Sequence, residues 1–211
     1  MGAIKLYTLF SPSHKKFFDK YLKPSLAEVG MQVVKKEIPQ DCKTARFEED
    51  GWNISMKRKI EYIIEAIRES KDEYLIYSDA DIYFFSSPEE ELLKTINGYD
   101  IVFQDNKDKG QRLCAGFFLC RTTEKVLNFF ELLKRDLFHF DNDQHAINEL
   151  KHNLKYGILS ERFFCLGKIW NGKDIELPKN CVMFHANWAV GVAEKLRLME
   201  KAVNNGVGLD K

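Results

Sequence analysis

Apolar runs of strand length alternate along this chain with longer segments whose apolar residues recur at helical spacing. Runs near 3–10, 32–38 and 74–78 have the composition of β-strands, and the segments between them, 13–29 and about 53–70, are amphipathic. The second amphipathic segment has one apolar stripe, which consists of Ile60, Ile63, Ile64 and Ile67. Because such a stripe must face a sheet, this order of strands and helices predicts an α/β fold.

The second half of the chain continues the alternation. We expect a kink at Pro24 in the first helix and a short acidic helix after Pro88. Further strands are expected at 100–104, 114–121 and 181–184, further helices at 123–137, 141–154 and 190–203, and a loop-rich aromatic stretch around 163–170. At 211 residues and 45% hydrophobic content the chain suits one domain, which we place at 1–204, with 205–211 as a tail or linker.

Charge and cysteine content exclude several classes of protein. Lys and Arg together number 32, as do Asp and Glu, so the net charge recruits neither nucleic acid nor an anionic membrane. The five cysteines are odd in number and show no Cys-x-x-Cys spacing, which favours reduced thiols in the cytoplasm over a disulfide framework or a zinc cluster. No apolar run reaches the length of a membrane span, and the first residues do not resemble a signal peptide.

An acidic pair, Asp79 and Asp81, directly follows the apolar strand YLIYS. If strand geometry continues through the residue between them, both carboxylates point to the same side and can reach one cation. Ligands bind at the carboxyl ends of strands in open α/β sheets, which favours a metal site here. Turn chemistry is the alternative, because Asp-x-Asp also arises by chance and recurs in this chain at Asp141 and Asp143.

His185 ends a short apolar strand, as the acidic pair ends another. If both strands run the same way in one sheet, the three side chains converge at one edge. Two carboxylates and one imidazole suit Mn²⁺ or Mg²⁺ better than zinc, with phosphate oxygens of a ligand completing the shell. A purely structural histidine is the alternative. The chain contains neither a P-loop nor a Gly-x-Gly-x-x-Gly loop.

Candidate phosphate ligands lie on the helices beside these strands. Gly191 precedes the last helix, whose N-terminus could direct amide groups at a diphosphate, and Lys195 on that helix could neutralise a phosphate. Lys57 lies on the apolar face near the start of the 53–70 helix, at the expected sheet edge. Either lysine could instead be a solvated surface charge, and Lys57 could be a side chain that snorkels.

Polar residues near a strand end and a helix start are further candidates for the functional site. Asp141 and Gln144 fit a capping box at the start of the 141–154 helix, which is a structural role. Asp143 shares a face with the apolar residues of that helix and points toward a cleft or a buried partner, unless it also acts as a cap. Asp105 follows the strand at 100–104, where it could hold a sugar hydroxyl or form a turn.

The order of these motifs resembles the GT-A nucleotide-diphospho-sugar glycosyltransferases over nearly the whole chain. The motifs are DAD after a strand, CAGFF, DQ followed by Asn148, and HANW with a lysine downstream. The resemblance implies a single GT-A-like domain with a Rossmann-like mixed sheet flanked by helices. It also implies a UDP-sugar donor, Mn²⁺ or Mg²⁺ on Asp79, Asp81 and His185, and uridine held near Thr8 and Lys57.

The resemblance extends to catalytic residues. In related retaining enzymes the glycine of the AGFF-like strand, here Gly116, and the DQ pair, here Asp143 and Gln144, line the donor-sugar pocket. This implies that glucose or another hexose or deoxyhexose is transferred to a glycan acceptor with retention of configuration, with Asp143 or Gln144 near the anomeric carbon. Many relatives carry a Golgi membrane anchor that has no counterpart here, and their lysine lies closer to the histidine than Lys195 does.

Two other functions stay open on the sequence alone. A metal-dependent phosphohydrolase or nucleotidyltransferase would use the same acidic pair on a phosphoryl group, although no further carboxylate cluster for a second metal is evident. A non-catalytic nucleotide-sugar or glycan-binding module, as part of a longer polypeptide, would bind such ligands without turnover.

Overall fold

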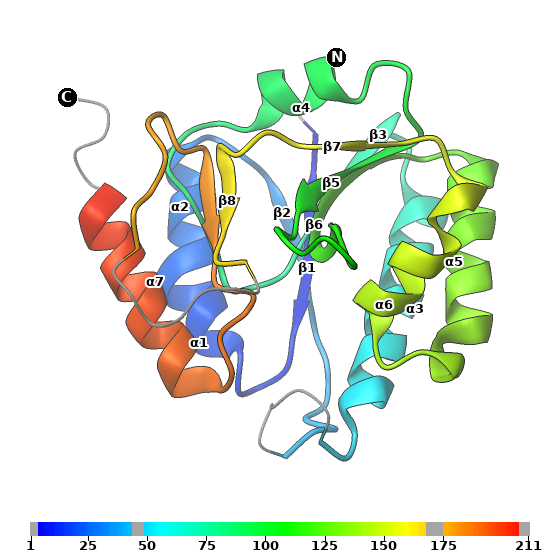
Figure 1. Cartoon of the computed structure of the whole chain (residues 1–211), viewed down its shortest axis with the longest axis horizontal. Coiled ribbons are helices and arrows are strands. Elements are labelled where there is room, and N and C mark those ends of the chain that lie inside the picture. The colour runs from blue at the N-terminus through cyan, green and yellow to red at the C-terminus, as the bar shows by residue number, and fades with distance from the viewer. Residues whose placement is uncertain (1–3, 44–48, 168–174, 207–211) are drawn as a thin grey trace.

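The computed structural model describes residues 4–43, 49–167 and 175–206, which form helices packed around two β-sheets (Figure 1). The larger sheet consists of β1 (Leu6–Phe10), β2 (Val33–Glu37), β3 (Tyr74–Ser78), β5 (Ile101–Asp105), β6 (Leu113–Arg121) and β7 (Tyr156–Ile158). Its spatial order is β2-β1-β3-β6-β5-β7. β1 pairs in parallel with β2 and β3, whereas β6 runs antiparallel to both β3 and β5. The predicted mixed sheet is therefore confirmed.

A second, smaller sheet covers part of one face of the first. It has the order β4-β9-β8 and consists of β4 (Ile82–Phe84), β8 (Phe163–Cys165) and β9 (Met183–His185). β9 is antiparallel to β4 and parallel to β8. The sequence did not indicate β4, β7 or β8, because strands of three residues are too short to establish a period.

Helices cover both faces of the larger sheet. They are α1 (Lys15–Phe17), α2 (Lys23–Glu28), α3 (Trp52–Glu69), α4 (Glu89–Thr95), α5 (Glu124–Asp136), α6 (Asp143–Leu150) and α7 (Val192–Gly206). In Figure 1, α3, α5 and α6 lie on the right of the sheet, and α1, α2 and α7 lie on the left with the smaller sheet. Each side has its own cluster of buried apolar side chains.

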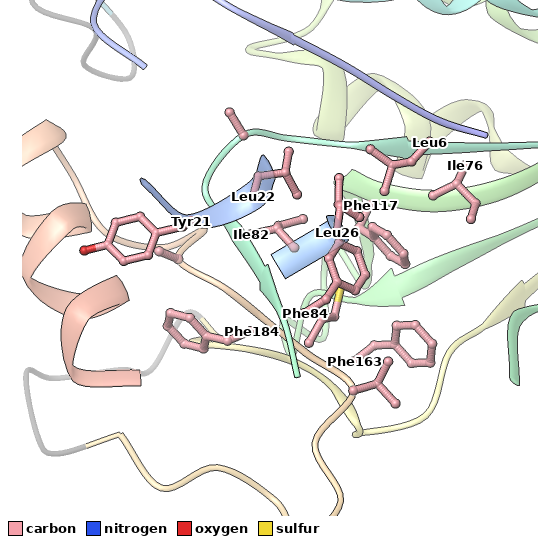
Figure 2. Close-up of a cluster of buried hydrophobic side chains, with 14 of the residues drawn as sticks. Leu6, Tyr21, Leu22, Leu26, Ile76, Ile82, Phe84, Phe117, Phe163 and Phe184 are labelled. Carbon is pink, nitrogen blue, oxygen red and sulfur yellow. The ribbon is translucent and has the colours of Figure 1, made fainter. Parts of the chain in front are cut away.

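Aromatic side chains fill the space between the two sheets. Figure 2 shows Phe117 of β6 beside Phe84 of β4 and Phe163 of β8. The ring centroid of Phe117 lies 5.9 Å from that of Phe84 and 5.7 Å from that of Phe163, and all three side chains are fully buried. Edge and offset contacts of this kind add to the stabilisation from apolar burial, so the smaller sheet is held firmly against the larger one.

The first helical region is irregular, as Pro24 predicts. α1 and α2 are joined by a π-helical turn, Phe18–Leu22, immediately before the proline. Proline has no amide hydrogen, and its ring collides with the carbonyl four residues earlier, here that of Lys20. A wider turn relieves that collision without ending the helix.

Several predicted boundaries need correction. The 141–154 helix is shorter, since α6 ends at Leu150 and a 3₁₀ turn, Lys151–Asn153, follows. The last helix is longer than expected and includes Asn205 and Gly206, which we assigned to the tail. Asn205 is held in place because its side-chain amide donates to the Ile175 carbonyl oxygen at 3.0 Å. The rest of the expected tail, 207–211, lies outside the described residues, as do residues 168–170 of the aromatic stretch expected at 163–170.

The state of the cysteines and the lengths of the described helices bear on two sequence predictions. All five cysteines belong to the described residues, and they are buried with no disulfide between any two of them. Among residues 4–43, 49–167 and 175–206, no helix is long and apolar enough to cross a membrane.

Candidate metal and nucleotide site

The acidic pair and His185 meet at the junction of the two sheets. Asp79 follows the last residue of β3, and Asp81 precedes Ile82, the first residue of β4. β4 pairs antiparallel with β9 so that Ile82 lies opposite His185. One ligand atom from each of Asp79, Asp81 and His185 lies within 4.8 Å of the other two.

The route to this convergence differs from the predicted one. We expected the strands of Asp79 and His185 to run the same way in one sheet, but β3 and β9 belong to different sheets. The carboxylates and the imidazole come together because the chain crosses from the larger sheet to the smaller one between Asp79 and Ile82, and β9 pairs with the strand that begins there.

Gly116 of β6 lies against two of these ligands. Its carbonyl accepts a hydrogen bond from the Asp79 amide at 2.7 Å. A Cβ atom at this position would lie 2.4 Å from Cε1 of His185 and 2.7 Å from Oδ2 of Asp79, which are impossible contacts. The absence of a side chain at Gly116 is therefore required for Asp79 and His185 to approach each other.

The donor set fits a hard divalent cation. Two carboxylates and one imidazole are typical ligands of Mn²⁺, and Mg²⁺ accepts the same oxygen donors together with water or phosphate. The mixed burial supports this fit, because Asp81 and His185 are buried whereas Asp79 is partly exposed toward a cavity. A ligand in that cavity could supply the remaining donor atoms.

Two basic side chains lie close to the Asp81 carboxylate. The Lys195 ammonium lies 2.5 Å from Oδ2 of Asp81, and Nε2 of His185 lies 3.6 Å from Oδ1. Burial raises the pKa of Asp81, but Lys195 and His185 outweigh it and hold the pKa well below its usual value. For His185, burial lowers the pKa, and Cys114 and Asp81 raise it to about 10. A cation bound at Nε2 of His185 would replace the proton that this nitrogen otherwise carries.

Lys59 is a site residue that the sequence did not reveal. Its ammonium lies 3.1 Å from Oδ1 of Asp79 and 2.9 Å from Oδ2 of Asp143, and its side chain is only 6% exposed. Burial lowers the pKa of Lys59, but Asp143 and Asp79 reverse this effect and raise the pKa overall. Lys59 thus joins a candidate metal ligand to the candidate catalytic acid.

The sequence singled out Lys57, two positions earlier on the same helix. Its ammonium lies 5.9 Å from the centre of the Phe138 ring, and Lys57 does not line the cavity at the acidic pair. A signal for Lys59 was present, because Lys59, Tyr62, Ile63 and Ala66 have helical spacing and are all buried. α3 packs against α5 and α6 as well as the sheet, so its buried face is wider than one stripe.

A cavity of about 470 Å³ opens beside the three candidate metal ligands. Of the residues proposed from sequence, its wall includes Asp79, Asp81, Gly116, Asp143, Gln144, His185, Gly191 and Lys195. Part of its lining is apolar and includes Leu9, Phe10, Ile38, Trp52 and Met56. The rest includes charged and polar side chains, so a ligand with one flat apolar group and one charged group would fit.

Thr8 and Asp105 do not line this cavity. Thr8 is buried in β1, where its hydroxyl has no hydrogen-bond partner among the described residues, and the neighbouring residues Leu9 and Phe10 face the cavity instead. The Asp105 carboxylate pairs with Arg112 at 3.0 Å and accepts from the Lys107 amide at 2.9 Å. These contacts favour the turn interpretation of Asp105.

The start of α6 is capped differently from the prediction. The side chain of Asn142, not Asp141, accepts a hydrogen bond from the His145 amide at 2.8 Å, so the predicted capping box is wrong. Oδ2 of Asp141 instead lies 3.0 Å from Nδ1 of the His145 side chain. Asp143 is buried and points inward as expected, with Lys59 as its buried partner, and Gln144 lies beside it on the cavity wall.

Comparison with known proteins identifies a family. The family described as nucleotide-diphospho-sugar transferase matches residues 17–199, which is most of the chain. That stretch contains Lys59, the acidic pair, Gly116, Asp143 and His185. No curated protein sequence matches this chain.

Solved structures of glycosyltransferases have a similar fold. One is a glycosyltransferase involved in the glycosylation of the major capsid of PBCV-1, with 13% identity and a TM-score of 0.63 over 94% of this chain and 98% of that chain. Another is the glycosyltransferase GlyE of Streptococcus pneumoniae TIGR4, with 13% identity and a TM-score of 0.64 over 97% of this chain and 60% of GlyE. At such low identity these likenesses show the fold, which is GT-A-like.

Proposed function

Because the chain belongs to the nucleotide-diphospho-sugar transferase family, we propose that it transfers a hexose or deoxyhexose from a UDP-sugar to a glycan acceptor. The observation that carries this proposal is the convergence of Asp79, Asp81 and His185 on the wall of the cavity. The GT-A-like fold, shared with two glycosyltransferases, agrees with it. Buried thiols without disulfides support a reducing compartment such as the cytoplasm.

The apolar and the polar lining residues of the cavity suit the two parts of UDP. The uracil ring would lie against Phe10, Ile38 and Trp52, and this assignment replaces Thr8 and Lys57 as its neighbours. The diphosphate would lie beside Gly191 and the Lys195 ammonium. Binding of the doubly charged diphosphate there would compete with Asp81 for Lys195.

Asp79, Asp81 and His185 would hold Mn²⁺ or Mg²⁺ next to the diphosphate. When bound, such an ion would take up negative charge as UDP leaves. The chain's own contribution is to fix its ligands in advance: Lys59 and the Tyr77 hydroxyl both contact Oδ1 of Asp79, at 3.1 Å and 3.0 Å. Ligands held in this way lose little freedom when the donor arrives.

Asp143 and Gln144 would be the catalytic residues. Both line the cavity that also includes the acidic pair, and the contact with Lys59 holds the Asp143 carboxylate in place. We propose transfer with retention of configuration, with these two side chains next to the anomeric carbon. The anomeric configuration of the product, read from its NMR coupling constant, tests this point, and an inverted product would refute it.

A donor screen tests the proposed reaction. With Mn²⁺ present, at least one UDP-hexose or UDP-deoxyhexose should release UDP, and an Asp79→Asn variant should release much less. Incorporation of the sugar into a glycan should accompany release. Hydrolysis of nucleotides that carry no sugar would instead indicate a phosphohydrolase, and binding of UDP-sugars without turnover of any would indicate a binding module.

A further inference from the structure

Gln104 of β5 connects the larger sheet to the smaller one beside the metal ligands. Its side chain is fully buried. The Nε2 amide group donates to the carbonyl oxygen of Phe163 in β8 at 3.1 Å, and Oε1 lies 2.8 Å from Nδ1 of His185 in β9. One side chain of the larger sheet therefore contacts two strands of the smaller sheet, including the strand that supplies the histidine ligand.

These contacts determine where the imidazole carries its proton. The opposite orientation of the Gln104 amide would place Oε1 against the Phe163 carbonyl oxygen, where two acceptors would repel each other. Oε1 therefore faces His185, and Nδ1–H of the ring donates to it. The other ring nitrogen, Nε2, faces Oδ1 of Asp81 at 3.6 Å.

We propose that Gln104 is a positioning residue of the metal centre, which holds His185 with Nδ1 protonated and Nε2 directed at the cation. The inference rests on the proposed function, because it assumes that Asp79, Asp81 and His185 bind a metal ion. The division of the ligands between two sheets explains the need for such a residue, since β9 alone does not fix the rotation of the ring. Partners of this kind commonly contribute about 10–100-fold in metal affinity.

A neighbouring residue supports the same arrangement. Asn106, two positions after Gln104, is also fully buried. Its Oδ1 accepts from the Asn187 amide group at 2.9 Å and from the Trp188 indole at 3.0 Å. Gln104 and Asn106 together thus contact three of the four side chains of the HANW segment, and Gln104 contacts the one that faces the acidic pair.

Matched substitutions at Gln104 test the proposal. Gln104→Met keeps the length and approximate volume of the side chain but removes both the donor and the acceptor, whereas Gln104→Glu keeps an acceptor for Nδ1–H and, when its other oxygen is protonated, a donor for the Phe163 carbonyl oxygen. The affinity for Mn²⁺ alone is measured by titration of the free-ion electron paramagnetic resonance signal. We expect Gln104→Met to bind about 10–100-fold more weakly and Gln104→Glu to bind nearly as well as the unaltered protein. Equal losses in both variants would overturn the proposal.

A double-mutant cycle separates positioning from general damage. In a His185→Ala background, Gln104→Met should weaken Mn²⁺ binding no further, because its effect acts through the imidazole. A further loss of the same size would show that Gln104 acts through the fold instead. Absence of Mn²⁺ binding by the unaltered protein would overturn the metal centre itself, and this inference with it.

A spectroscopic measurement needs no Gln104 variant. In the Mg²⁺-loaded unaltered protein, ¹⁵N NMR should show the proton of His185 on Nδ1, with the resonance assigned by its loss in His185→Ala. A proton on Nε2 in the loaded protein would refute the proposal even if the Gln104 variants fail to fold.

Discussion

At the scale of single residues, the site depends on oppositely charged side chains that are buried in contact with one another. Lys59, Asp79 and Asp143 form one buried or partly buried group, with the ammonium between the two carboxylates. Removal of one member of such a group leaves the others without a counter-charge, which costs more than the loss of an exposed ion pair. Lys59 should therefore matter for stability as well as for catalysis.

Lys59→Met should lower the free energy of unfolding by about 3–5 kcal/mol, because Asp79 and Asp143 lose their shared partner. Lys57→Met on the same helix is the matched control and should change it by less than about 0.5 kcal/mol. Urea denaturation of both variants measures the difference. Equal effects of the two substitutions would contradict a stabilising role for the buried contacts of Lys59.

Gly116→Ala should weaken Mn²⁺ binding strongly and destabilise the protein by about 1–3 kcal/mol, since the new methyl group would collide with His185 and Asp79. Gly110→Ala is the control, because a Cβ there has an ordinary 3.8 Å contact with Asp108. Mn²⁺ titration and thermal denaturation give the two readouts. Unchanged Mn²⁺ affinity in Gly116→Ala would contradict the close approach of the ligands.

At the scale of the elements, long periodic segments were predictable and short ones were not. The 53–70 helix and the strand before Asp79 appear within one residue of their predicted limits, because their apolar patterns span several turns or a full strand. β4 has three residues, and its partner is far away in sequence. Only the pairing of β4 with β9 brings His185 to the acidic pair, and no local pattern encodes that pairing.

The cap of α6 gives a test at this scale. Asn142→Ala should lower the free energy of unfolding by about 1 kcal/mol, because the His145 amide loses its acceptor. Asp141→Ala, at the position that the sequence suggested as the cap, should cost less than about 0.5 kcal/mol, since its pair with His145 is an exposed contact between neighbouring turns. A larger loss of stability in Asp141→Ala than in Asn142→Ala, measured by urea denaturation, would indicate that Asp141 is the cap.

At the scale of the whole molecule, two sheets and two apolar clusters meet at the site. The larger sheet supplies Asp79 and Gly116, the smaller one supplies His185, and helices on opposite faces supply Lys59 and Lys195. The sequence predicted the fold class, and its three candidate metal ligands do lie together in the structure, because strand ends and motif order carry that information. It did not predict Lys59 or Gln104, because their roles arise from contacts between elements distant in sequence.

The central claim is that Asp79, Asp81 and His185 form a metal centre that holds the diphosphate of UDP. Thermal denaturation with UDP, in the presence and absence of Mn²⁺, tests it most directly when an Asp81→Asn variant is measured in parallel. At about a hundred times its dissociation constant, UDP should add roughly 2.7 kcal/mol to the stability of the unaltered protein. The account predicts that this gain requires Mn²⁺ and disappears in Asp81→Asn. No stabilisation by UDP with Mn²⁺, or equal stabilisation of the variant, would contradict it.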